Sequence, residues 1–325
     1  MHEALHEAID ADDPERVRAL LLERAQPLRR DTGLGAHSDL STLQLAALYA
    51  PEAAPLLLRR GVACDLHSAC ALGRTDDVRA LVAADAAELT ALAEGLTPLA
   101  VAIVQGQAEA VHCLLALGDD PNRAVPRAAF YAWEVAAQRR GAGRWTPLHL
   151  AALHGYHETG PEMIDALRAA GADATRASTL GALAVHLAAA HGWTEQLDRL
   201  LAPGDDVDAR TEPVAHEVWD LAGAPPHAEL SHAQTALHVA AREGQVDVAR
   251  GLLERGADVH AEDSGRATPL HLAAYPFWGA SPELVRLLLA SGADPARRDR
   301  LGRSPLDLAR AAGGGETAAL LGGSR

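Results

Sequence analysis

One alternation of polar and apolar residues recurs along the chain. A Thr or Ser is followed by Pro or Ala, and then by an apolar run of the form Leu-x-Leu-Ala-Ala. The clearest copies begin at Thr146, Thr235 and Thr268, and weaker copies lie at 97–102, 185–192 and 304–309. The hydroxyl group caps free backbone N–H groups, and Pro fits the first helical turn. Each copy therefore predicts a short helix, and several of these helices end at a Gly.

A second apolar phrase follows each copy. It contains paired leucines, such as Leu252 and Leu253, and it ends in Gly-Ala-Asp at 171–173, 256–258 and 292–294. The phrase predicts a second helix and a turn into the next unit. A single helix pair cannot bury its apolar face alone, so we expect the pairs to stack into one continuous core.

The unit of two helices resembles the ankyrin repeat, which consists of a turn and two antiparallel helices in 33 residues. The fourth residue of the first phrase stands at 67, 100, 149, 186, 238 and 271, so an interval of 33 residues occurs twice. The resemblance extends over nearly the whole chain. It implies an all-α fold, an ankyrin-repeat solenoid of about nine helix-turn-helix units.

The same register divides the chain into segments of a single domain, residues 1–325. Two intervals, of 49 and 52 residues, exceed the period. Both excesses lie between one unit's turn and the next capped helix, where the family has a finger that overhangs the concave face. The expected segments are a capping repeat at 2–26, repeats at 42–122, a finger insertion at 123–143, repeats at 144–210, a second finger insertion at 211–232, repeats at 233–298 and a capping repeat at 299–325.

Histidine recurs at the fourth position of the phrase, as His149, His186, His238 and His271. Regular histidines suggest a metal site. However, the resemblance implies that each one bonds to the preceding Thr and to the backbone of the next repeat, which is a structural role. Helices about 10 Å apart also make a tight metal shell difficult. We expect no metal and no cofactor.

The resemblance places the exposed concave positions at the end of each first helix. Among them, His154, His191 and Glu243 come from three successive repeats below the insertions. Two imidazoles and a carboxylate are able to perform acid–base chemistry or bind a metal. The alternative is an ordinary polar concave surface. The full set of these positions is Val104, Gln105, Leu153, His154, Ala190, His191, Arg242, Glu243, Tyr275 and Pro276.

Aromatic residues are only 3% of the chain, yet several lie in or beside the two insertions or in later helix–helix turns. Large aromatic side chains are common anchors at binding sites. The alternative is that they hold the inserted segments against the repeats. Trp145 occupies a finger position that is exposed in the family, which favours binding. The candidates are Tyr131, Trp133, Trp145, Trp219, Tyr275 and Trp278.

The formal net charge is −15 and the chain contains no lysine. A strongly acidic chain disfavours nucleic acids and anionic membranes as partners and is compatible with a basic one. The lack of lysine excludes Schiff-base and phosphate-loop lysines, and together with abundant alanine it suggests a GC-rich bacterial genome. No leader or apolar segment of about 20 residues is present, so we expect a cytoplasmic protein.

These features favour a non-enzymatic interaction module, a monomer that binds a protein or peptide on its concave face and finger insertions. The alternative is a small-molecule-binding protein or an unusual enzyme, with a pocket roofed by the insertions and with His154, His191 and Glu243 as its acid–base residues. A third possibility is an immunity-type partner of a basic protein, which only the net charge suggests.

Overall fold

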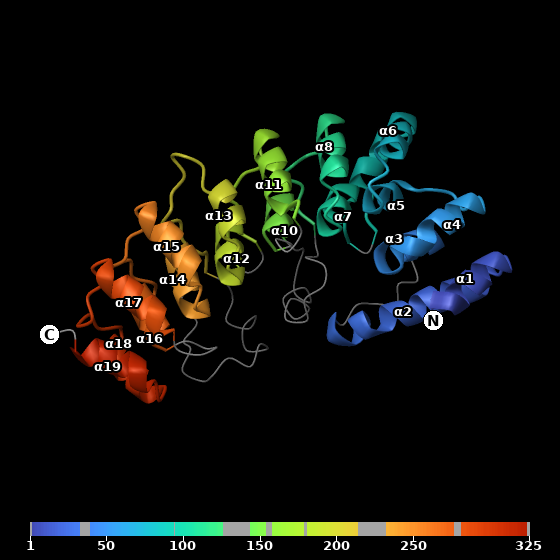
Figure 1. Ribbon diagram of the computed structural model, residues 1–325. Helices are drawn as coiled ribbons and strands as arrows, with labels where there is room; N and C mark the ends of the chain where they lie inside the picture. The colour runs from blue at the N-terminus through green and yellow to red at the C-terminus, as the bar shows by residue number, and fades with distance from the viewer. Residues whose placement is uncertain are drawn as a thin grey trace. The chain divides into compact units, whose positions relative to one another are not determined.

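The described residues of the computed structural model form paired helices and no strand (Figure 1). They are residues 2–32, 40–93, 95–125, 144–153, 158–178, 181–213, 232–275 and 281–323. The chain comprises two compact units, Met1–Asp173 and Ala174–Arg325. The all-α class expected from the sequence is therefore confirmed. Predicted sites at His154, Tyr131, Trp133, Trp219 and Trp278 lie outside the described residues.

The N-terminal unit begins with the pair α1 and α2, and α2 packs on α3. Pro51 begins a short 3-10 turn before α4, so the second helix of this repeat starts late. Helix α2 continues beyond residue 26, where the capping repeat was expected to end. The helices are α1 (His2–Asp10), α2 (Pro14–Thr32), α3 (Thr42–Tyr49), α4 (Ala54–Arg59), α5 (Leu66–Ala71), α6 (Thr75–Ala84), α7 (Pro98–Val104), α8 (Ala108–Ala116), α10 (Pro147–Leu153) and α11 (Gly160–Ala169).

The C-terminal unit stacks four helix pairs. The first helices of the pairs, α12, α14, α16 and α18, pack side by side in one layer, and the second helices α13, α15, α17 and α19 form the other. The bounds are α12 (Ala184–His191), α13 (Thr194–Leu200), α14 (Ala236–Glu243), α15 (Val246–Glu254), α16 (Pro269–Ala274), α17 (Pro282–Ala290), α18 (Pro305–Ala311) and α19 (Gly315–Gly323).

The start and end signals of the sequence are realised in the structure. The hydroxyl oxygen of Thr97 accepts a hydrogen bond from the backbone N–H of Ala100 at 3.2 Å. Gly192 and Gly244 end α12 and α14 with φ angles of 77° and 74°. Both angles are in the left-handed region that Gly adopts without strain. Leucines of the apolar run, such as Leu148 and Leu237, are at most 1% exposed.

Trp145 contradicts the expectation of an exposed finger position, because its side chain is only 1% exposed. Its carbonyl accepts a hydrogen bond from the N–H of Val125 at 2.8 Å, and its own N–H donates to the Val125 carbonyl at 3.3 Å. The indole also makes an edge-to-face contact with the His149 ring, with centroids 6.0 Å apart. Burial of a large apolar side chain is favourable. Trp145 therefore belongs to the core of the N-terminal unit.

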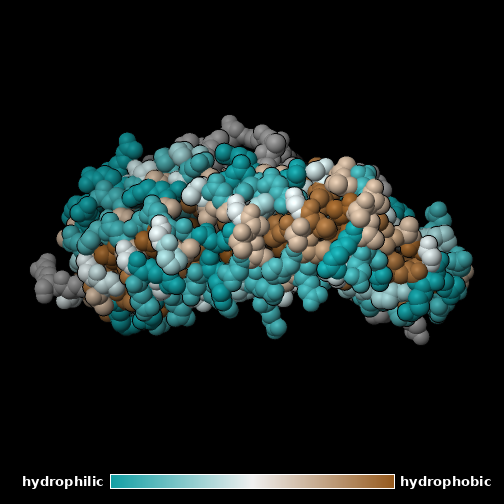
Figure 2. Space-filling model, turned by 90° about the horizontal axis from the view of Figure 1, so that it is seen from above, coloured by the Kyte–Doolittle hydropathy of each residue, from teal (hydrophilic) through white to brown (hydrophobic). Residues whose placement is uncertain are grey.

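The face seen from above is mostly hydrophilic, and its apolar side chains gather mainly in the N-terminal unit (Figure 2). Leu117, at the end of α8, is 37% exposed, and Leu81 and Leu115 are half-buried. Scattered exposed leucines of this kind are normal on soluble domains. Within the part of the chain that the structure describes, no helix is both long and apolar enough to cross a membrane.

In several repeats, the residue two positions before the N-terminal cap of the first helix has a left-handed backbone conformation. Gly95, Gly181 and Gly302 occupy it with φ angles of 81°, 69° and 77°. In two other repeats, Ala233 and Arg266 occupy the same position with φ angles of 60° and 57°. A side chain with a Cβ is disfavoured in this region.

Replacing Ala233 with Gly is therefore expected to increase the free energy of unfolding. The relief of left-handed strain contributes more free energy than the added conformational entropy of the unfolded chain costs. We therefore expect the free energy of unfolding to rise by about 1 kcal/mol. Urea unfolding followed by circular dichroism measures it. Ala296→Gly, in an exposed turn without a positive φ, is the control and is expected to give no gain. Equal effects of both substitutions would contradict this explanation.

Candidate functional site

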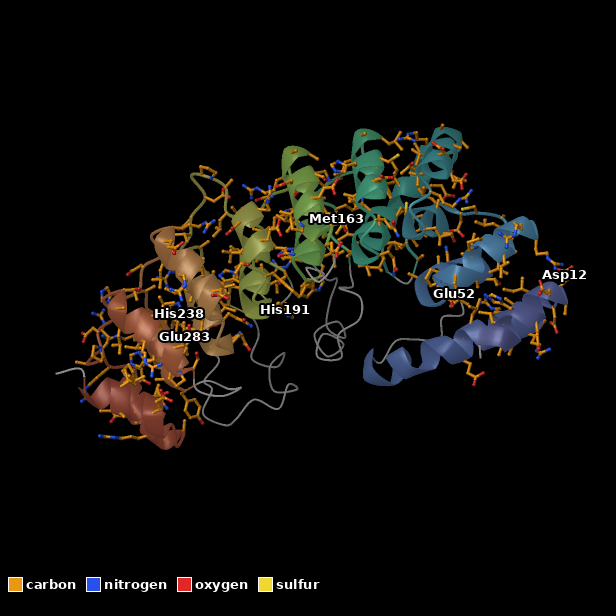
Figure 3. All side chains as sticks on the ribbon, in the orientation of Figure 1. Asp12, Glu52, Met163, His191, His238 and Glu283 are labelled. Atoms are coloured by element: carbon orange, nitrogen blue, oxygen red, sulfur yellow. The ribbon has the colours of Figure 1, made fainter. Side chains whose placement is uncertain are left out.

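Four predicted site residues lie at the same end of three adjacent helices in the C-terminal unit. His191 is the last residue of α12, Arg242 and Glu243 end α14, and Tyr275 caps α16. Because α12, α14 and α16 pack side by side, these residues form one row, which we call the helix-end row. Figure 3 labels His191 in this row and the motif residue His238 in α14.

The helix-end row is accessible and polar. His191 is exposed, and Arg242, Glu243 and Tyr275 are half-buried. The guanidinium group of Arg242 donates through Nε to Glu243 Oε1 at 2.8 Å and through Nη1 to Gln234 Oε1 at 2.9 Å. The row thus presents charged groups whose positions are fixed by neighbouring side chains, which reduces the entropy lost on binding.

His191 stands on an aromatic side chain that the sequence prediction did not include among the site residues. Its ring stacks on the indole of Trp193, with centroids 6.2 Å apart and an interplanar angle of 29°. Partial burial lowers the pKa of His191, and the nearby carboxylate of Glu243 opposes this effect. His191 is therefore mostly neutral near pH 7. The position of Trp193, directly after the helix-ending Gly192, is the sequence signal that could have indicated it.

Trp193 also has an unusual polar atom. Its indole Nε1 is buried and donates to no acceptor within the described residues. Buried donors normally have a partner, and an unpaired one costs about 1–3 kcal/mol.

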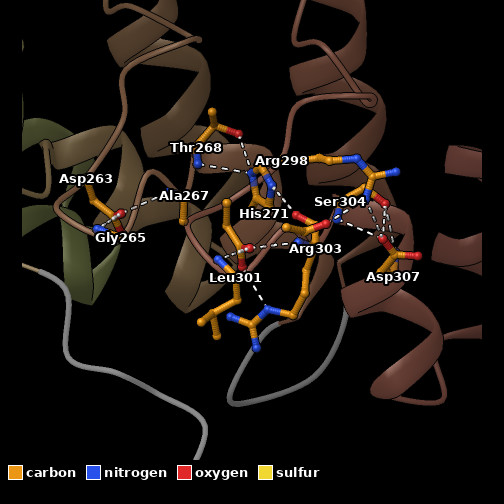
Figure 4. A network of polar contacts seen from close by, with 12 residues as sticks. Asp263, Gly265, Ala267, Thr268, His271, Arg298, Leu301, Arg303, Ser304 and Asp307 are labelled. Atoms are coloured by element: carbon orange, nitrogen blue, oxygen red, sulfur yellow. Dashed lines mark hydrogen bonds and ion pairs between the residues drawn. The ribbon is translucent and has the colours of Figure 1, made fainter.

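The motif histidines have the structural role that the family resemblance implies. The backbone N–H of Thr235 donates to His238 Nδ1 at 3.2 Å, so the ring proton is on Nε2, which donates to the Ala267 carbonyl at 3.1 Å. His271 makes the same bonds to Thr268 and to the Arg303 carbonyl (Figure 4). Each histidine therefore connects one repeat to the next.

Burial keeps these rings neutral. It lowers the pKa of His186 and of His238 to about 4, although backbone carbonyls that accept from the rings oppose the effect. A neutral imidazole in a fixed tautomer makes two hydrogen bonds and has no lone pair available for a metal. Among the described residues, no group of three or more His, Cys, Asp or Glu side chains is arranged to hold a metal ion.

Several acidic residues of the turns between repeats accept backbone hydrogen bonds. Asp206 accepts from the N–H of Asp208 at 3.0 Å, and Asp120 accepts from the N–H of Asn122 at 2.9 Å, which is the usual function of Asp in turns. The carboxylate of Asp208 accepts from the N–H of Asp258 at 3.1 Å and so connects two turns that are 50 residues apart. These three carboxylates therefore have a structural role.

The first residues of the two predicted insertions, 123–143 and 211–232, make backbone hydrogen bonds to residues just after these insertions. Val125 and Trp145, which flank residues 126–143, form an antiparallel bridge. Thr211 donates to the Gln234 carbonyl at 2.9 Å and accepts from the N–H of Ala233 at 3.1 Å, across residues 214–231. The described residues on either side of 126–143 and of 214–231 are therefore paired with each other.

Comparisons with known proteins agree with this architecture. The family of ankyrin repeats (3 copies) matches residues 159–263 and 212–299. The ankyrin repeat domain of human ASB11 superposes with a TM-score of 0.59 at 26% sequence identity, covering 81% of this chain and all of that domain. The chain is therefore an ankyrin-repeat protein.

Two curated relatives are informative. The B-cell lymphoma 3 protein homolog of Mus musculus is 33% identical over 235 residues, which are 71% of this chain and 45% of the relative. Protein phosphatase 1 regulatory subunit 12A of Mus musculus is 37% identical over 84 residues, which are 25% of this chain and 8% of the relative. The chain thus spans less than half the length of these relatives. Ankyrin repeats generally mediate protein–protein interaction, and the fold suggests protein partners.

Proposed function

We propose that this chain is an interaction module that binds a protein or peptide along the helix-end row of its first helices. The observation that carries the proposal is the row itself. Three adjacent helices present His191, the Arg242–Glu243 pair and Tyr275 at one end. Repeated first helices in a solenoid form an extended binding surface of this kind.

The chemistry of the row suits a polypeptide ligand. Arg242 and Glu243 offer a donor and an acceptor 2.8 Å apart, and the stacked rings of His191 and Trp193 offer an aromatic surface. Paired polar groups beside aromatic anchors are typical of protein interfaces. One relative is named as a regulatory subunit of protein phosphatase 1, which supports a role in assembly with another protein.

The two predicted insertions, 123–143 and 211–232, are proposed as clamps that also contact the partner. The Val125–Trp145 bridge and the hydrogen bonds of Thr211 connect their first residues to the repeats and support this proposal. Tyr131, Trp133, Trp219, Trp278 and His154 remain candidate contacts in this proposal. The net charge of −15 favours a partner with a basic surface facing most of the chain.

The test uses full-length variants as baits in the lysate of the native host. His191→Ala with Glu243→Ala alters the helix-end row. Arg250→Ala with Glu254→Ala alters exposed residues of α15 and is the matched control. Quantitative mass spectrometry of the eluates is expected to show proteins retained by the native chain and the control and reduced at least about fivefold with the row variant. Equal retention by all three baits would refute the proposal.

A further inference from the structure

The turn before α18 reverses the charge of the rest of the chain. Residues 296–303 contain four arginines and one aspartate, in a protein whose formal net charge is −15. Three of these arginines neutralise acids of the same region. Arg297 Nη2 lies 2.7 Å from Glu262 Oε1, Arg303 Nε lies 2.8 Å from Asp299 Oδ2, and Arg298 Nη1 lies 3.6 Å from an Asp307 oxygen.

The fourth arginine of this turn, Arg300, adds charge that these acids do not balance. It is exposed, as is Arg266 in the preceding turn, whose side chain is 63% exposed. Arg266 Nε lies 3.4 Å from Glu262 Oε2. The other oxygen of this carboxylate, Oε1, already pairs with Arg297. With Asp263 included, the two turns and Asp307 hold five arginines and four carboxylates, so the region has a net charge of +1 in an acidic chain.

A backbone hydrogen bond holds the two tips together. The N–H of Arg300 donates to the carbonyl of Gly265 at 2.8 Å, so Arg300 and Arg266 are neighbours. Each turn is also fixed internally by a buried carboxylate (Figure 4). Asp263 accepts from the N–H groups of Gly265 and Ala267, and Asp299 accepts from those of Leu301 and Arg303, at 2.8–2.9 Å. The surface is thus pre-organised.

Leu301 adds an exposed apolar side chain next to the charged side chain of Arg300. Its side chain is 57% exposed and follows Arg300 directly in the sequence. The position of Arg266 is also informative, because it maintains a φ of 57° where Gly95, Gly181 and Gly302 stand in other repeats. Ala233 occupies the same position with a φ of 60°, so the strain is shared, but Arg266 is the one of these two residues that places a charged side chain there.

We propose that the tips formed by Arg266, Arg300 and Leu301 bind an acidic segment of a partner protein that carries an apolar residue. The surplus arginines attract the carboxylates, and Leu301 contacts the apolar side chain. The overall charge of −15 opposes nucleic acids and anionic membranes, which present extended negative charge, more strongly than it opposes a short acidic peptide. The inference rests on the proposed function, namely that the chain binds a protein.

The experiment uses fluorescence anisotropy with the full chain and a fluorescein-labelled peptide of Glu-Glu-Leu repeats. Saturable, salt-sensitive binding is expected, and a peptide of Glu-Glu-Ser repeats is expected to bind at least about threefold more weakly. Arg300→Glu and Arg266→Gly are each expected to weaken binding of the first peptide about fivefold. Arg266→Gly also relieves backbone strain, so a loss of binding in this variant is not caused by unfolding.

Two controls make the result specific. Arg250→Glu changes an exposed arginine on α15, and Ala233→Gly relieves the same strain without changing charge. Both are expected to bind the peptide as the native chain does. No saturable binding, an equal loss with Arg250→Glu, or equal binding of the Ser peptide would overturn the inference.

Binding of a DNA duplex or of phosphatidylserine vesicles that is lost with Arg300→Glu would also overturn it, in favour of a polyanion. The failure of this inference is separate from failure of the proposed function. If the peptide does not bind while the His191→Ala, Glu243→Ala variant still loses its captured proteins, only the inference about the turn tips falls.

Discussion

Acidification from about pH 7 to about pH 5 is expected to lower the stability of the C-terminal unit steeply, by roughly 3 kcal/mol per pH unit near pH 5. Burial lowers the pKa of His186 and of His238 from 6.5 to about 4. Between these values the unfolded chain binds two protons that the folded unit does not bind. The stability is therefore complete above about pH 6.5 and is lost as the pH falls towards 4.

Urea unfolding at a series of pH values, followed by circular dichroism, measures this dependence. His238→Gln removes one of the two groups, so the variant is expected to be less stable at neutral pH but to have a pH slope reduced by about half. The control His260→Gln changes an exposed histidine and is expected to leave the slope unchanged. If the free energy of unfolding of the His238→Gln variant has the same pH slope as that of the native chain, the buried ring is not the source of the effect.

Replacing Asp119 with Ala is expected to stabilise the N-terminal unit at neutral pH by about 2 kcal/mol. Asp119 stands at the buried position of the Gly-Ala-Asp turn, which Ala257 and Ala293 occupy in other repeats. Its side chain is 1% exposed, and its Oδ2 has no hydrogen-bond partner among the residues that the structure describes. Arg123 Nε lies 3.8 Å from Oδ1, which is too far for a hydrogen bond.

The direction of the expected stability change follows from the raised pKa of Asp119. Burial raises the pKa of Asp119 from 3.8 to about 6, although the N–H of Asp120, which donates at 2.8 Å, and the charge of Arg123 oppose the shift. The folded unit therefore holds a proton between these values and is destabilised as the pH rises through about 6. The gain from Asp119→Ala is expected to be present at about pH 7.5 and to shrink towards pH 4, as measured by urea unfolding.

The neighbouring Asp120 provides the control, because it is exposed and accepts from the N–H of Asn122 at 2.9 Å. Asp120→Ala is expected to give no gain. A gain of equal size at both ends of the pH range would mean that packing, and not the buried charge, explains the effect of Asp119→Ala.

The sequence was sufficient for the fold because its signals are local. The Thr hydroxyl, the following Pro and the terminal Gly define each helix within about ten residues, and these signals agree with the apolar period. The roles of His238 and His271 also followed from the repeat, because a residue at the same place in every unit meets the same backbone groups of the next one.

The sequence was less informative where contacts join distant segments. Trp145 was expected to be exposed because its repeat position is exposed in the family, but its backbone pairs with Val125, 20 residues earlier in the chain. The stacking of Trp193 on His191 depends on two side-chain rotamers at a helix end, which no residue pattern specifies. The sequence shows that Asp119 stands where other repeats have Ala. It does not show that the Oδ2 atom of Asp119 lacks a hydrogen-bond partner among the described residues.

The most direct test of the central claim is the comparison of captured proteins between the native chain and the His191→Ala, Glu243→Ala variant. We expect the native chain and the Arg250→Ala, Glu254→Ala control to retain the same partner and the row variant to lose it at unchanged stability. Retention of the partner by the correctly folded row variant would contradict the account and would place the binding surface elsewhere on the molecule.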